Sequence, residues 1–242
     1  MKNLEFFSQE TWNPFAAYGL TGNFWNIRYH TVIFTWVVIL AIFVLIFLSR
    51  IYLKKENSIG QYLILSFVTS FKDQVTESLG KFEFRHFAFI TSLFTFIFLC
   101  NIISIFPFIE EPTIDLNTTL GLGITAFLYV QINSILHNGI KTYIKEYFLP
   151  FFLFFPVNVI GTLSTIISTS FRLFGNIFGG AIISGLWRGS IAGAILLESV
   201  GILSGINLLL TGFFVLFEGF IQAFVFATLS LTYLAIEIQH DE

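Results

Sequence analysis

The sequence predicts an all-α integral membrane protein with about five membrane helices, one interfacial amphipathic helix and a long, strongly tilted C-terminal helical hairpin. The composition is 55% hydrophobic and 11% charged, with 33 phenylalanines and a mean hydropathy of +0.82, whereas about a quarter of the residues in soluble domains are charged. Uncharged runs long enough to cross a bilayer recur along the chain, and the last two exceed the length of one perpendicular span. No linker or repeat divides residues 1–242, so we expect a single membrane domain.

The chain begins with a polar segment, residues 1–30, which we place on the outer side of the membrane. This segment contains Glu5 and Glu10 and has no continuous apolar core, which argues against a signal or transit peptide. Residues 31–50 form the first expected span, because nineteen uncharged residues precede Arg50.

Residues 58–85 predict an amphipathic helix. Apolar residues recur at every fourth position from Leu63 to Leu79, while charged side chains such as Lys72 and Glu77 lie elsewhere on the helical wheel. A helix with one apolar and one charged face lies in the plane of the membrane interface.

Residues 86–137 predict a two-helix hairpin. Its uncharged spans, 87–109 and 119–136, are joined by an acidic, turn-rich segment. The second span carries Gln131 and Asn133, whose amides we expect to face protein rather than lipid.

The distribution of basic residues predicts the orientation. Six of the twelve lysines and arginines lie between Arg50 and Arg85, and two more follow the third span, whereas the segment from Glu110 to Asp115 has none. Basic loops stay on the inner side of a membrane, so the N-terminus is expected outside and the C-terminus inside.

Residues 148–238 predict the long hairpin. Each of its two apolar stretches has about forty residues, or ~60 Å of helix, which is twice the hydrocarbon thickness and requires a strong tilt. Antiparallel pairing about a turn between the stretches would place Arg172 near Gln222 and Asn176 near Glu218.

Arg172 is the first candidate functional residue, because it is the only formal charge between Tyr147 and Trp187. A guanidinium at the centre of a membrane helix costs about 2.5 to 3.5 kcal/mol on insertion scales. The chain offers no acid between Glu146 and Glu198 as a structural partner. A lone cation at this depth therefore predicts a role on an ion pathway.

A polar stripe accompanies Arg172 along the expected helix. Its members fall at steps of three and four residues: Asn158, Thr162, Thr165, Ser168 or Thr169, Arg172 and Asn176. Such a stripe predicts a hydrated path. The alternative for the hydroxyls is hydrogen bonding to carbonyls of their own helix, and the sequence leaves both interpretations open.

Three strings of residues resemble subunit a of the F-type ATP synthase. They are Glu111 to Leu120, Pro156 through Asn158 to the run Ser170–Asn176, and Ile221 to Tyr233. They follow the family's order and spacing over roughly residues 85 to 236. The resemblance implies a stator subunit that provides two offset half-channels beside a rotating ring. It also implies that Arg172 is the essential arginine, with Asn176 and Gln222 beside it.

The same resemblance implies the partners and the location. The partners would be the ring of c subunits, b-type subunits of the peripheral stalk, other Fo subunits and the lipid bilayer. The membrane would be energy-transducing, either a bacterial plasma membrane or a mitochondrial inner membrane. The chain would conduct ions without a catalytic site or cofactor of its own. In this family the choice between proton and sodium depends largely on the ring.

The chain departs from the family at the proton-relay acids. Many members have an acid nine positions after the arginine, where Ala181 stands, and a Glu or His seven positions before the glutamine, where Val215 stands. We therefore expect Glu218, one turn before that glutamine, to take over the relay. The family's usual acid near Gly161 and basic residue near Thr165 are also absent.

Further polar residues are expected to line the two half-channels. They are Asn158, Thr162, Thr165, Ser168, Glu198, Glu111, Asp115 and Asn117. The acids among them would form the outer mouth, and ordinary solvated loop positions are the alternative for these acids.

Other classes of function fit the sequence less well. A single cysteine in an apolar run and four histidines without ligand spacing predict neither a disulfide framework nor a metal site. The basic residues are scattered, which argues against nucleic-acid binding. A stand-alone ion channel or transporter is the alternative, although the sequence shows no internal repeat or filter-like loop.

Overall fold

The computed structural model describes residues 11–12, 19, 27–55, 57–106, 109, 111–148, 151–191 and 205–239. Five helical segments of this part are long and apolar enough to cross a membrane: Tyr29–Leu53, Phe84–Ile105, Leu116–Asn138, Phe152–Trp187 and Gly212–Ile238. The predicted all-α membrane fold is thus confirmed. Glu198 and the expected turn of the hairpin lie outside the described residues.

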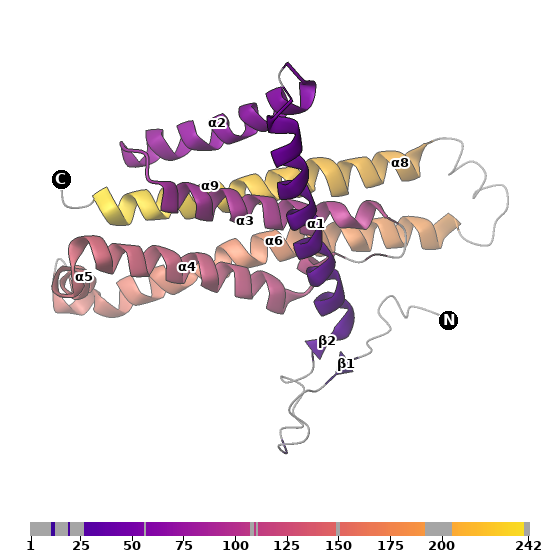
Figure 1. The fold of residues 1–242 in the computed structure, drawn as a ribbon. Coiled ribbons are helices and arrows are strands. Elements are labelled where there is room, and N and C mark those ends of the chain that lie inside the picture. The colour runs from indigo at the N-terminus through magenta and orange to yellow at the C-terminus, as the bar shows by residue number, and fades with distance from the viewer. Residues whose placement is uncertain are drawn as a thin grey trace.

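Helix α1 (Tyr29–Leu53) is the first span. Two short strands, β1 (Thr11–Trp12) and β2 (Ile27–Arg28), pair antiparallel just before it. Figure 1 shows α1 crossing the other long helices at a steep angle. Most of its apolar side chains are exposed and only Val38 is buried, as expected for a helix surrounded largely by lipid.

Helix α2 (Ile59–Leu79) lies crosswise near the end of α1 (Figure 1). Ser58 caps its first turn by accepting a hydrogen bond from the Gly60 N–H at 3.2 Å. The helix ends six residues earlier than expected, because Gly80 adopts a left-handed conformation with φ 70°. The side that faces the core contains Phe71, Val75 and Leu79.

The predicted two-helix hairpin consists of α3 (Phe84–Ile102) and α4 (Leu116–Asn138). The short 3-10 helices η3 (Ile103–Ile105) and η4 (Pro112–Ile114) lie in the connection. A further helix that the sequence did not predict, α5 (Ile140–Tyr147), follows α4 after Gly139, whose φ is 81°. Glycine adopts this positive φ without steric cost, so the chain can turn sharply between the two helices.

The long hairpin starts with η5 (Phe152–Phe154) and α6 (Phe155–Ile191). It returns through α8 (Ile206–Thr211), the π-helix η6 (Gly212–Glu218) and α9 (Gly219–Gln239). The two arms run antiparallel in Figure 1. The 37 residues of α6 give a length of ~55 Å, so this helix would have to tilt by roughly 55° from the membrane normal to stay within ~30 Å of hydrocarbon.

The core lies where α9 packs against α2, α3, α4 and α6. Phe226, Leu231 and Leu234 of α9 are almost completely buried there. Leu173 of α6 joins the same cluster and is 1% exposed. The core therefore fixes the part of α6 that carries Arg172 against α9.

Candidate functional site

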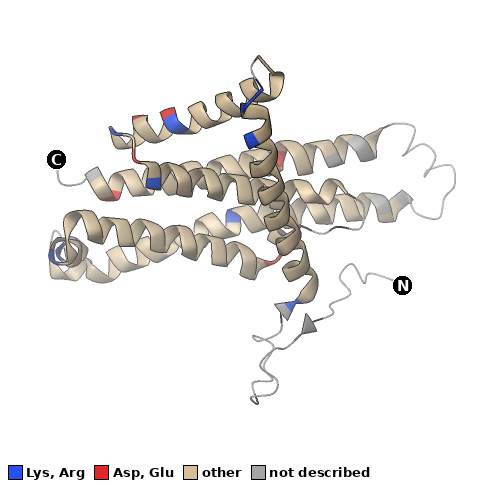
Figure 2. Ribbon diagram, in the orientation of Figure 1, with Lys and Arg blue, Asp and Glu red and all other residues tan. Residues whose placement is uncertain are grey.

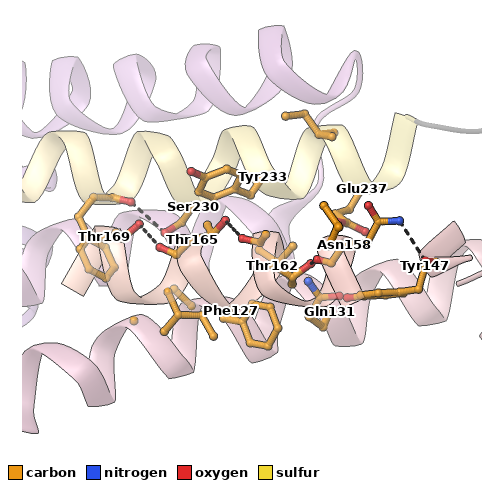
Figure 3. A pocket seen from close by; sticks show the side chains of 18 of the residues that line it. Phe127, Gln131, Tyr147, Asn158, Thr162, Thr165, Thr169, Ser230, Tyr233 and Glu237 are labelled. Atoms are coloured by element: carbon orange, nitrogen blue, oxygen red, sulfur yellow. Dashed lines mark hydrogen bonds between the residues drawn. The ribbon is translucent and has the colours of Figure 1, made fainter. Parts of the chain in front are cut away.

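A pocket of about 820 Å³, lined by apolar side chains and by several polar ones, lies between α4, α6 and α9 at the end of the bundle where α5 is located. We call it the α5-end pocket. The residues discussed below that line it are Gln131, Lys145, Tyr147, Asn158, Thr162, Thr165, Thr169, Ser230, Tyr233 and Glu237. Figure 3 shows Glu237, Gln131 and Asn158 near Tyr147, with Thr169 toward the opposite end.

The predicted stripe on α6 forms one wall of this pocket. Asn158, Thr162, Thr165 and Thr169 line it, whereas Ser168 is exposed and is not part of the lining. The hydroxyls of Thr162 and Thr169 donate to carbonyls one turn earlier on α6, both at 2.9 Å. The hydrogen bonds to carbonyls of the same helix are thus present, and the hydrated path stays a prediction that is compatible with them, because a hydroxyl that donates to its own helix still has an acceptor oxygen for water.

The opposite walls contribute Glu237, which the sequence did not single out, and Gln131, whose amide was expected to face protein. Glu237 on α9 accepts a hydrogen bond from the Ser134 hydroxyl at 3.0 Å, and its backbone carbonyl accepts one from the Asn138 amide at 2.8 Å. Gln131 on α4 is 8% exposed, and its side-chain oxygen has no hydrogen-bond partner among the described residues. The sequence signal for Glu237 was an acid in the last turns of an apolar helix, which resembles an ordinary charged terminus.

A second polar cluster lies at the opposite end of the bundle, where the end of α3 with η3 and η4 meets the start of α9. We call it the Glu111 cluster; it comprises Glu111, Ser104, Asn101 and Thr113, together with the carbonyl of Gly219. The Ser104 hydroxyl donates to the Glu111 carboxylate. The Thr113 hydroxyl donates to Oδ1 of the Asn101 side chain at 2.9 Å, and the side-chain amide of Asn101 donates to the Gly219 backbone carbonyl at 3.0 Å.

The pKa of Glu111 is raised to about 7, chiefly by burial; the hydrogen bond from Ser104 opposes the shift, and the nearby carboxylate of Glu218 contributes to it. A carboxyl with a pKa near neutrality exchanges its proton readily at the pH of most cells. The electrostatic effect of Glu218 also places the two acids near each other, although they are 107 positions apart in the sequence. Glu218 is the last residue of η6, and single π-helical turns occur frequently at functional sites.

Arg172 lies near the middle of α6, on its exposed side. Among the described residues no carboxylate lies within ion-pair distance of its guanidinium. Thr169, which lines the α5-end pocket, precedes Arg172 by one turn. In Figure 2 most charged residues gather toward the ends of the helices, so a charge in the middle of α6 is an exception.

The register of the hairpin agrees with the predicted pairing. A Cβ atom on Gly180 would lie 2.8 Å from the Phe214 ring, so these two positions face each other closely. In two antiparallel helices, the position numbers of facing residues add up to the same value along the pair. Positions 180 and 214 have the same sum as positions 172 and 222, so Arg172 and Gln222 are expected to face each other in this register. Gln222 is buried, whereas Asn176 and Glu218 are half-buried.

Two further predicted site residues, Asp115 and Asn117, belong to neither cluster. Asp115 caps α4 by accepting a hydrogen bond from the Asn117 N–H at 3.1 Å, and Asn117 is exposed. This geometry is that of an ordinary helix N-cap. Glu198 lies outside the described residues.

Comparison with known proteins gives a consistent result. The family model described as ATP synthase A chain matches residues 32–235. ATP synthase subunit a of Moorella thermoacetica is 33% identical over 86% of this chain and 89% of its own length. ATP synthase subunit a 2 of Acaryochloris marina is 31% identical over 88% and 86%, respectively. A relative from Propionigenium modestum, named ATP synthase subunit a, sodium ion specific, is 31% identical over 84% of this chain and 72% of its own length.

Proposed function

Because the chain belongs to the family of ATP synthase A chains, we propose that it guides ions past a rotating ring of c subunits through two offset half-channels, with Arg172 between them. The chain is a multi-pass integral protein of an energy-transducing membrane and takes part in ion transport coupled to ATP synthesis. The two half-channels, the essential arginine and the identity of the neighbouring subunits are our proposal.

The observation that carries this proposal is the position of Arg172. Its guanidinium is exposed on α6, has no carboxylate partner among the described residues and follows the polar pocket by one turn. An unpaired charge at membrane depth is costly. A carboxylate on a neighbouring subunit would neutralise it, and a ring that presents one carboxylate after another would do so at every step.

The electrostatics of such a contact explain how rotation and ion flow are coupled. A fixed cation lowers the pKa of a ring carboxylate that approaches it, so the carboxyl releases its proton into one half-channel. The same cation repels a hydronium ion that would otherwise cross directly between the half-channels. The membrane potential, about 2.3 kcal/mol per charge per 100 mV, then drives rotation of the ring.

The two polar clusters fit the two half-channels. The α5-end pocket would be the inner half-channel, because α5 lies at the end of the bundle that carries the basic loops, and basic loops stay on the inner side. The Glu111 cluster lies at the opposite end and would serve the outer half-channel. Glu218 connects this cluster with the hairpin and would replace the relay acids that are missing at Ala181 and Val215.

The surface that would face the ring is formed by the two arms of the hairpin. Phe213, Phe217, Phe220 and Phe224 are exposed along η6 and α9. These apolar side chains can slide past apolar side chains of a ring without forming polar contacts that would hold it in place. The b-type subunits of the peripheral stalk and other Fo subunits would contact other surfaces.

Replacement of Arg172 tests the proposal. In inverted membrane vesicles that contain the assembled complex, Arg172→Ala should abolish ATP-driven ion pumping while the complex still assembles. Arg50→Ala, at the end of α1, removes an exposed arginine outside the site and should leave pumping intact. Continued coupled pumping by Arg172→Ala would overturn the proposal. Measurements with proton-sensitive and sodium-sensitive dyes would identify the ion.

Glu218→Gln tests the outer relay in the same vesicles. The variant should pump at a greatly reduced rate, because an amide cannot take up and release a proton. Pumping at the wild-type rate would show that Glu218 is not the relay.

A further inference from the structure

We propose that Glu237 is the proton-exchanging carboxylate of the α5-end pocket, taking up protons that leave the pocket and releasing them to the aqueous phase on the inner side. This inference rests on the function proposed above and adds one residue to it. Among the described residues that line the pocket, only Lys145 and Glu237 carry a charge, and Glu237 is the only carboxylate.

The first argument is the way in which Glu237 is held. Ser134 donates to Oε2 at 3.0 Å, and Asn138 donates to the backbone carbonyl at 2.8 Å, so α4 holds the residue at two points. No described residue donates to the other carboxylate oxygen, Oε1. One oxygen is therefore fixed, while the other is left to accept a proton at the pocket.

The second argument is Gln131. This side chain lines the same pocket, is 8% exposed, and has a buried oxygen without a partner among the described residues. Buried polar atoms in native proteins are nearly always hydrogen-bonded to protein or to an ordered water. The unpartnered oxygen therefore points to a water molecule in the pocket. Figure 3 shows Gln131 and Glu237 toward the same end of the pocket.

Among the described residues of the remaining walls there is no competing carboxylate. α6 contributes hydroxyls and the Asn158 amide, and α5 contributes Lys145 and Tyr147. Of the other titratable groups near α9, Tyr233 lines the pocket. His86 of α3 is bound by Glu83 at 3.0 Å and by Tyr129 at 2.9 Å.

On its other side, α9 packs against α2, whose apolar side chains Phe71, Val75 and Leu79 belong to the same core cluster. Among the described residues that line the pocket, Lys145 is the charged residue besides Glu237.

The proposed proton exchange needs no reactant other than water and the proton itself. A hydronium ion in the pocket transfers its proton to Oε1 of Glu237, so one O–H bond breaks, another forms and a water molecule remains. The carboxylic acid then gives this proton to water or buffer on the inner side, which regenerates the carboxylate. During ATP hydrolysis the same two steps run in reverse.

The experiment uses the intact complex in inverted vesicles and compares Glu237→Gln with Glu77→Gln. Glu77 is an exposed carboxylate on α2 outside the pocket. Glu237→Gln should slow ATP-driven proton pumping at least about tenfold, which is less than the full effect of a positioned acid–base group because water in the pocket still conducts. Glu77→Gln should pump like the wild type.

Two readouts separate proton exchange from a structural role. Hydronium is the main remaining donor in Glu237→Gln and falls tenfold with each pH unit, so the deficit should widen as the pH on the inner side rises. Formate or another small weak acid on that side should restore part of the rate. A loss that is independent of pH and unaffected by weak acids would overturn the inference, as would wild-type pumping.

If the complex with Glu237→Gln does not assemble, Glu237→Asp tests the role of Glu237. The shorter carboxylate still exchanges protons but moves away from Ser134, so its pH profile should shift relative to the wild type. A profile that superimposes on that of the wild type would overturn the inference. Arg172→Ala is measured in parallel. If it still pumps, the proposed function fails, whereas a block there combined with normal pumping by Glu237→Gln refutes only the role of Glu237.

Discussion

At Gly123 on α4, α4 and α6 approach each other so closely that there is no room for a side chain. A Cβ atom added there would overlap the Ser170 hydroxyl, while the next nearest atoms, both of Ile166, lie at 3.5 Å, which is ordinary van der Waals contact. Ser170 is completely buried, and its hydroxyl has no hydrogen-bond partner among the described residues. The steric conflict therefore comes from one oxygen atom.

This geometry predicts how protein stability changes in a double-mutant cycle of Gly123 and Ser170. Gly123→Ala alone should destabilise the protein by about 1–3 kcal/mol, the usual cost of overpacking a core. Ser170→Ala alone should be neutral or slightly stabilising, because it removes a buried hydroxyl without a partner. In the double variant the conflicting oxygen is gone, so the two substitutions should show a coupling energy of about 1–3 kcal/mol in favour of the pair.

The assay is the thermal inactivation midpoint of the detergent-purified complex, together with the SDS concentration at which this subunit dissociates. Gly121→Ala is the matched control, since a Cβ atom at this α4 position would meet nothing within 4 Å. It also calibrates the gain in helix propensity, about 1 kcal/mol, that any Gly-to-Ala change brings. The reasoning is refuted if Gly123→Ala is as stable as Gly121→Ala, or if Ser170→Ala gives no rescue.

Three other predictions follow from the contacts described above. Burial raises the pKa of Glu111 from 4.5 to about 7, so its stabilising contribution is present below pH 4.5 and is lost as the pH rises to about 7. In Glu111→Gln the thermal midpoint of the complex should therefore depend less on pH over this window. Gly180→Ala should cost about 1–3 kcal/mol because its Cβ atom would lie 2.8 Å from the Phe214 ring. Gly179→Ala meets nothing within 4 Å and should be at least as stable as the wild type in SDS titration. Asn101→Ala removes two buried hydrogen bonds and should lower the thermal midpoint, with about 1–3 kcal/mol lost for each buried group left unpaired; an unchanged midpoint would contradict this account.

Much of the fold follows from the sequence because lipid imposes strict rules. A bilayer core offers no water to backbone groups, so long uncharged runs must be helical, and the spans around Val38, Leu93 and Val130 were recognisable in this way. The amphipathic repeat likewise predicted α2, whose buried side contains Phe71 and Val75. The end of this helix depended on the backbone of Gly80, which a repeat of side chains cannot reveal.

The candidate site was only partly visible in the sequence. The stripe on α6 was recognisable, because residues three or four positions apart share one face of a helix. The Glu111 cluster was not, because it depends on a contact between α3 and the start of α9 across more than a hundred residues. The π-helix η6 was also not predicted, because a change from α to π hydrogen bonding depends on packing rather than on a composition signal.

The sequence alone determined that this chain is a helical membrane protein with one arginine in an otherwise uncharged membrane segment, because the length and charge of each segment decide its place in a bilayer. Only the tertiary structure decided which distant groups share a pocket with the polar stripe. Glu237 resembles a charged chain terminus in the sequence, yet the packing of α9 against α4 places it beside Ser134 and the α5-end pocket. The physical reason is that side-chain proximity across helices depends on their packing, which local sequence patterns do not encode.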